Sequence, residues 1–145
     1  MHIRRFQAGF TLLEMLVVLV IIGLLAGLVG PKLFNRLDAS KVQTAEAQLK
    51  MLRGTIEMLR LDIGRLPTDQ EGLGLLDNAP PNAREAARWR GPYLEDVLPA
   101  DPWGNPYIYA VPGANRQAFA LYSYGADGRP GGEGDNADIG ILPAR

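Results

Sequence analysis

The hydrophobic and polar positions divide the chain into three regions. Residues 10–30 form an almost unbroken apolar run whose only charged residue is Glu14. A helix rises about 1.5 Å per residue, so about 20 residues cross a bilayer core and this run is long enough to span a membrane. Residues 31–64 then follow an amphipathic helical pattern, and residues 65–145 have the pattern of a small globular head.

The amphipathic region carries one apolar stripe. Apolar residues recur there at alternating spacings of three and four, which is the period of one helix face. They are Val42, Ala45, Leu49, Leu52, Ile56, Leu59 and Ile63. We predict a helix that packs by this face on a small sheet; a coiled coil is the alternative. Gly64 is the predicted stop, and Pro31 is predicted to kink or loosen the helix.

The head contains ten of the eleven prolines and three strand-like runs. Residues 107–111 and 118–123 flank the turn-forming residues 112–115, which predicts an antiparallel hairpin. A third short strand is predicted near residues 137–141. The pattern therefore predicts an α+β protein, in which a long N-terminal helix with a transmembrane half and an amphipathic half packs on a small antiparallel sheet.

Composition excludes several kinds of chemistry. The 15 basic and 16 acidic side chains leave a net charge of -1, which argues against nucleic acid as a partner because phosphate binding needs a basic face. The chain has no cysteine, and its single histidine is His2. Disulfides, thiolate zinc sites and Cys- or His-based catalysis are therefore not expected. We predict a protein that is not an enzyme; a membrane-anchored enzyme using its carboxylates is the weakest hypothesis.

Glu14 is unusual because a carboxylate in hydrocarbon costs on the order of 2.5–3.5 kcal/mol. Either it stays hydrated near the headgroups, or it pairs with a cation. A cut between Gly9 and Phe10 would make Glu14 the fifth residue, one helical turn from a new α-amino group on its own or a neighbouring chain. Arg4 and Arg5 precede the run and predict a cytoplasmic N-terminus. The run is longer than the core of a typical cleaved secretory signal.

The tail from residue 125 to residue 138 is a candidate metal site. Four carboxylates and one amide lie there among glycines: Asp127, Glu133, Asp135, Asn136 and Asp138. Hard oxygen ligands on a flexible loop suit Ca²⁺, although the spacing is not that of an EF-hand. A solvated cluster of acidic turns is the alternative.

The six residues from Gly9 to Glu14, GFTLLE, followed by the apolar run, resemble the class III signal of type IV pilins and type II secretion pseudopilins. The resemblance implies that residues 1–9 are a prepilin leader, cleaved after Gly9 by a prepilin peptidase that also N-methylates Phe10. It further implies that Glu14 serves assembly by neutralising the N-terminus of an adjacent subunit.

Motifs of the head resemble the family of major pseudopilins of the type II secretion system. They are LPT at 66–68, EGL at 71–73, GPYL at 91–94, DPWGNPY at 101–107 and YSYGADG at 122–128. This resemblance implies a pilin-like fold whose C-terminal loop binds one Ca²⁺. Asp127 matches a side-chain ligand and Tyr124 a backbone-carbonyl ligand. Asp135 is the second expected side-chain ligand, and Asn136 and Asp138 are further candidates.

The same resemblance implies a partner set and a role. The chain would insert into the inner membrane with its head in the periplasm, then polymerise into a pseudopilus that drives export of folded proteins across the outer membrane. Its partners would be other copies, the prepilin peptidase, minor pseudopilins, an inner-membrane assembly platform and, before assembly, membrane lipid. The alternative is a type IV pilin or minor pseudopilin with a calcium-dependent adhesion head. The absence of cysteine favours the pseudopilin, because type IV pilin heads usually close a loop with a disulfide.

The aromatic residues of the head have two interpretations. They could form a sugar-binding surface, or they could pack in the core and turns of a small domain. They are Trp89, Tyr93, Trp103, Tyr107, Tyr109, Tyr122 and Tyr124. We favour packing, with Trp103 as the anchor of a turn.

Overall fold

The computed structural model describes residues 10–144, and within the first helix it leaves out the side chains of residues 29–37. The predicted leader and Gly9 lie outside the described residues. The chain divides after Leu37 into two compact units, and each is described by itself.

The first unit holds the beginning of α1 (Leu12–Ile63). Thr11 caps this helix, because its Oγ1 accepts a hydrogen bond from the backbone N–H of Glu14 at 3.2 Å. The apolar side chains that follow are exposed; Leu12, for example, is 84% exposed. Among the described residues, no helix has an apolar stretch long enough to cross a membrane.

The predicted membrane span and the predicted kink at Pro31 both involve residues whose side chains the structure does not describe. The predicted span of residues 10–30 ends on two residues whose side chains are among those left out. α1 continues through Pro31, whose side chain is also left out, so the predicted kink or loosening there stays a prediction.

In the second unit, α1 packs by the predicted stripe. Ala45, Leu52, Ile56 and Leu59 are fully buried, and Val42 packs against the edge of the same core. This confirms the amphipathic period and the packing of the helix on a sheet. α1 ends at Ile63, and the next residue takes φ +88°, a left-handed conformation that favours glycine and confirms the predicted stop.

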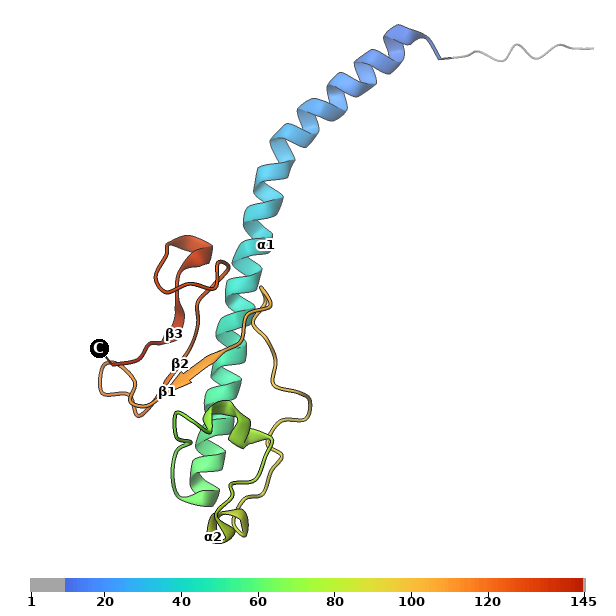
Figure 1. The fold of residues 1–145 in the computed structure, drawn as a ribbon. Coiled ribbons are helices and arrows are strands. Elements are labelled where there is room, and N and C mark those ends of the chain that lie inside the picture. The colour runs from blue at the N-terminus through green and yellow to red at the C-terminus, as the bar shows by residue number, and fades with distance from the viewer. Residues whose placement is uncertain (1–9, 145) are drawn as a thin grey trace, which may run out of the picture. The chain divides into compact units, whose positions relative to one another are not determined.

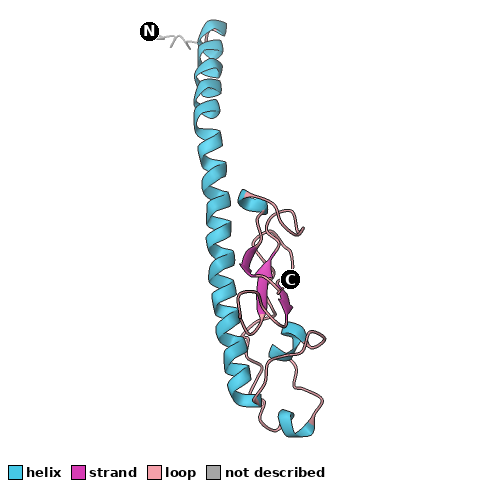
Figure 2. Cartoon of the chain, turned by 90° about the vertical axis from the view of Figure 1, so that its left-hand side faces the viewer, coloured by secondary structure: helices cyan, strands magenta, loops and turns pink. Residues whose placement is uncertain are grey.

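The sheet has three antiparallel strands in the order β1-β2-β3. They are β1 (Ile108–Ala110), β2 (Ala120–Ser123) and β3 (Ile139–Ile141). Tyr122 of β2 pairs with Ile108 on one side and Gly140 on the other. Both the hairpin and the third strand are confirmed. Figure 1 follows these strands by colour, and Figure 2 shows the sheet beside the head part of α1.

The described part of the head also contains short helical segments. The 3-10 helix η1 (Gly72–Leu76) buries three leucines in the core shared with α1. The single-turn helix α2 (Ala83–Ala86), labelled in Figure 1, is capped by Asn82, whose side chain accepts a hydrogen bond from the backbone N–H of Arg84. The 3-10 helix η2 (Gly134–Asn136) lies in the tail loop just before β3.

Candidate functional site

Glu14 lies in the first turn of α1, three residues after the capping Thr11, and both are exposed. This Thr-x-x-Glu spacing is that of a capping box, in which the acidic residue supports the start of the helix. A carboxylate is also stabilised there by the positive end of the helix dipole. Glu14 therefore occupies a capping-box position that the sequence interpretation did not consider, beside its predicted pairing with an N-terminus. The expected new N-terminal residue, Phe10, is 80% exposed.

The tail loop closes on itself at its base. The backbone N–H of Ala126 donates a hydrogen bond to the carbonyl oxygen of Asp135 at 2.8 Å. Gly125 has φ +71°, and a Cβ there would lie 2.7 Å from the carbonyl oxygens of Asp135 and Ala137. These two carbonyl oxygens therefore lie so close to Gly125 that no residue with a side chain would fit at this position.

The predicted ligands lie near the Ala126–Asp135 bond that closes the loop, and each has its own hydrogen-bond partners or degree of burial. Asp127 is exposed, and its Oδ1 accepts a hydrogen bond from the backbone of Arg129 at 3.0 Å. Both carboxylate oxygens of Asp138 lie 3.1 Å from the backbone nitrogen of Gly131. Asp135 is half-buried within η2.

The last two predicted ligands flank the loop. Tyr124 is half-buried immediately before Gly125, and Asn136 is exposed at the end of η2. Among the described residues, no three Asp, Glu or His side chains converge as a metal cluster. A cation bound here would therefore take part of its ligands from backbone carbonyls and water, which is ordinary for Ca²⁺. The donor chemistry of the loop fits this ion.

Asp101 is a buried carboxylate that the sequence interpretation placed in a family motif but gave no role. It is only 4% exposed. Its Oδ1 accepts hydrogen bonds from the backbones of Trp103 and Asn105, and its Oδ2 accepts one from the hydroxyl of Ser123 on β2. The sequence predicted a turn anchored by Trp103, but not the hydrogen bond that joins this turn to the strand leading into the tail loop.

The aromatic residues pack as predicted. Trp103 and Tyr109 lie half-buried against the core, while Tyr107 and Tyr122 are buried. The hydroxyl groups of Tyr122 and Tyr124 lie 3.3 Å apart. Burial, then the hydrogen bond and the charge of Tyr124, and last the negative charge of Asp138 raise the pKa of Tyr122 to about 12. These rings therefore belong to the core and to the base of the loop.

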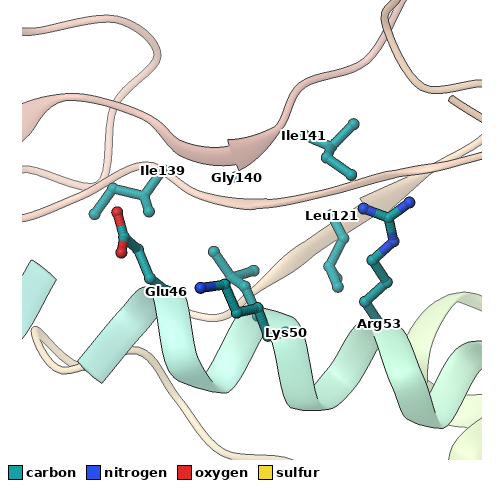
Figure 3. A pocket seen from close by; sticks show the side chains of 8 residues that line it. Glu46, Lys50, Arg53, Leu121, Ile139, Gly140 and Ile141 are labelled. Carbon is teal, nitrogen blue, oxygen red and sulfur yellow. The ribbon is translucent and has the colours of Figure 1, made fainter. Parts of the chain in front are cut away.

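A pocket of about 310 Å³ lies between α1 and β3. Figure 3 shows the charged side chains of Glu46, Lys50 and Arg53 along α1, opposite the apolar Ile139 and Ile141. All of its charged groups come from one helix face and its other wall is apolar, so we assign it no chemistry.

The fold and sites define a class of protein. A helix with an exposed apolar N-terminal part and a second part packed on a small antiparallel sheet is the architecture of a pilin-like subunit. Residues 32–142 match the family model described as type II secretion system protein G, and residues 4–30 match the prokaryotic N-terminal methylation motif. The chain belongs to the type II secretion system protein G family, which confirms the resemblance.

Curated relatives agree over nearly the whole chain. The type II secretion system core protein G of Pseudomonas aeruginosa is 44% identical over 137 residues, covering 94% of this chain and 96% of the relative. The proteins of the same name in Vibrio cholerae and Escherichia coli K12 are each 41% identical, over 136 and 135 residues. They cover 94% and 93% of this chain, and 92% of each relative.

A solved structure shows the same fold. The crystal structure of the major pseudopilin from the type 2 secretion system of enterohaemorrhagic Escherichia coli is 35% identical, with a TM-score of 0.61. The match covers 76% of this chain and 93% of that one. These likenesses favour the major pseudopilin over the alternative of a type IV pilin or minor pseudopilin.

Proposed function

We infer that this chain is a structural subunit of a type II secretion pseudopilus, anchored in the membrane and assembled in the periplasm. One observation carries this conclusion: the methylation motif at residues 4–30 and the protein G match at residues 32–142 lie on one chain. The exposed apolar surface of the first part of α1 supports it, because such a surface needs lipid or other subunits to cover it.

The assembly pathway that we propose begins in the inner membrane, with the leader on the cytoplasmic side and the head in the periplasm. A prepilin peptidase cuts after Gly9 and methylates Phe10. The N-terminal segments of α1 then pack as the core of a helical fibre, and Glu14 pairs with the N-terminus of a neighbour. Such contacts join different surfaces of identical subunits, so they propagate a filament.

The fibre is proposed to drive folded proteins across the outer membrane. Minor pseudopilins and an inner-membrane assembly platform are the proposed partners in its growth. The proposal assigns no catalytic step to the chain.

Deletion and re-supply of this chain in the bacterium that makes it test the proposed role. We expect the deletion to stop the appearance of folded exoproteins in the medium while leaving them in the periplasm. Re-supply of the full chain should restore their release. Unchanged secretion after the deletion would contradict the proposal.

We also propose that the tail loop binds one Ca²⁺. Asp127 and Asp135 would supply carboxylate oxygens and Tyr124 a backbone carbonyl, with Asn136 and Asp138 as further candidates. The hydrogen bond between Ala126 and Asp135 supports this assignment, because it brings the two ends of the loop together. Bound Ca²⁺ would hold the loop to the head, which has no disulfide to do so.

Thermal unfolding of the full chain in detergent, with calcium or with a chelator, tests this site. Calcium that binds only the folded state should raise the unfolding free energy by about 2.7 kcal/mol at 100 times Kd. Asp127→Ala should remove most of this gain, whereas Asp96→Ala, an exposed carboxylate outside the loop, should retain it. Equal melting temperatures in calcium and chelator for the wild-type chain would exclude the site.

A further inference from the structure

The first residue of the tail loop is held by two side chains from other parts of the head. The backbone N–H of Gly125 donates a hydrogen bond to Ser123 Oγ at 3.0 Å. Its carbonyl oxygen accepts one from Asn105 Nδ2 at 2.9 Å. Both polar backbone groups of Gly125 are therefore fixed, one by the end of β2 and one by a turn 20 residues earlier.

Gly125 lies where the start and the end of the loop meet. It turns the chain through its left-handed conformation, and it packs against the carbonyl oxygens of Asp135 and Ala137 where the loop returns. The next residue, Ala126, makes the backbone bond to Asp135. Movement of Gly125 would therefore displace the start and the end of the loop together.

Asn105 also supports the far side of the turn that presents Asp127. A Cβ on Gly128 would lie 3.1 Å from Asn105 Oδ1, so the amide of Asn105 lies close beside this glycine as well. Asn105 is half-buried, and its own backbone is fixed by a 2.7 Å hydrogen bond to the buried carboxylate of Asp101. Its amide thus bonds to one end of the turn from Gly125 to Gly128 and lies beside the other end, while its backbone is bonded to Asp101.

We propose that Asn105 is a positioning residue for the cation site of the tail loop. It is not a ligand: its amide nitrogen donates to the carbonyl of Gly125 and holds the turn in the geometry that aims Asp127. The cation affinity of the loop then depends on a residue outside it. This inference rests on the proposed calcium site.

The test compares Asn105→Ala with Asn78→Ala in the full chain in detergent. Asn78 is an exposed control for the bond type, because its Nδ2 also donates to a glycine carbonyl, that of Gly74 within η1 rather than one in the loop. With a chelator present, Asn105→Ala should speed amide hydrogen exchange in residues 126–137 about tenfold and leave β2 and β3 at wild-type rates. In a calcium titration its Kd should rise about five- to tenfold. Asn78→Ala should change neither.

Two results would overturn the proposal. One is exchange and calcium affinity in Asn105→Ala equal to those of the control. The other is a uniform acceleration across the loop, β2 and β3, which would mean that Asn105 only stabilises the head. Asn105→Ser, too short to reach Gly125, should reproduce the loop-restricted effect if Asn105→Ala folds poorly. If the wild-type chain shows no calcium binding in the titration, the metal site itself is refuted. The hydrogen-exchange rates measured with chelator would then still decide whether Asn105 positions the loop.

Discussion

Arg65 joins two carboxylates that lie six and 20 residues further along the chain. Its guanidinium makes paired hydrogen bonds of 2.7 and 2.8 Å to Glu71 and of 3.0 and 2.7 Å to Glu85. Glu71 also accepts hydrogen bonds from the backbone and the hydroxyl of Thr68, each at 2.9 Å. Paired bonds of this kind are stronger than single ones, so this cluster ties the segment around η1 and α2 to the end of α1.

This cluster predicts acid sensitivity of the head. The hydrogen bonds from Arg65 lower the pKa of Glu71 to about 2, whereas an unfolded Glu titrates at about 4.3. Because the folded pKa is the lower one, the stabilisation is present above about pH 4.3 and is lost as the pH falls towards 2. Unfolding free energies of the full chain, measured from pH 6 to pH 2, should therefore decline over this interval.

The variant Glu71→Gln should flatten that decline. Glu57→Gln, which alters an exposed ion pair with Arg60, is the control and should keep the wild-type pH dependence. The same acid decline in Glu71→Gln and wild type would rule out this cluster as its cause.

At the scale of elements, sequence patterns correctly predicted the features that depend on one continuous stretch of residues. The apolar stripe of α1, its end just before Gly64 and the three strands all follow from local patterns. β1 ends one residue earlier than predicted, because the backbone N–H of Val111 donates a hydrogen bond to the side chain of Asp69 instead of to a strand, and Pro112 follows it with no backbone N–H. No pattern predicted α2, which has a single turn and buries none of its residues.

The candidate sites also divide into those that the sequence could predict and those that it could not. The cleavage motif, Glu14 and the acidic tail could be predicted because each lies in one short segment of the sequence. The contacts of Asp101 and Asn105 could not, because they join segments about 20 residues apart through side-chain bonds that leave no periodic signal. The expected ligand set came from family resemblance, and it stays a prediction.

Two glycines, one within α1 and one directly after it, should respond in opposite directions to alanine. Gly54 is exposed within the helix, and a Cβ there would meet nothing within 4 Å, so Gly54→Ala should raise the unfolding free energy by about 0.5–1 kcal/mol. Gly64 has φ +88°, so Gly64→Ala should lower it by roughly 1–2 kcal/mol. Denaturant unfolding of both variants measures this, and a shared sign would contradict the helix end at Ile63.

On the scale of the whole molecule, the two units carry separate tasks. The unit that ends at Leu37 presents exposed apolar side chains and Glu14, which suit burial in lipid or among other subunits. The unit from Asp38 has its own core and holds the tail loop. Assembly is thus proposed to depend on the first unit, and stability of the head on the second.

Electron microscopy of fibres formed by Glu14→Gln tests the central claim most directly. Glutamine also suits this position of a capping box, so the variant keeps the start of α1 and removes only the charge. We predict normal cleavage after Gly9 but at least tenfold fewer fibres than the wild-type chain, while Glu57→Gln assembles normally. Wild-type fibre numbers from Glu14→Gln would show that the carboxylate serves only the helix cap, and they would contradict assembly through its pairing with a neighbouring N-terminus.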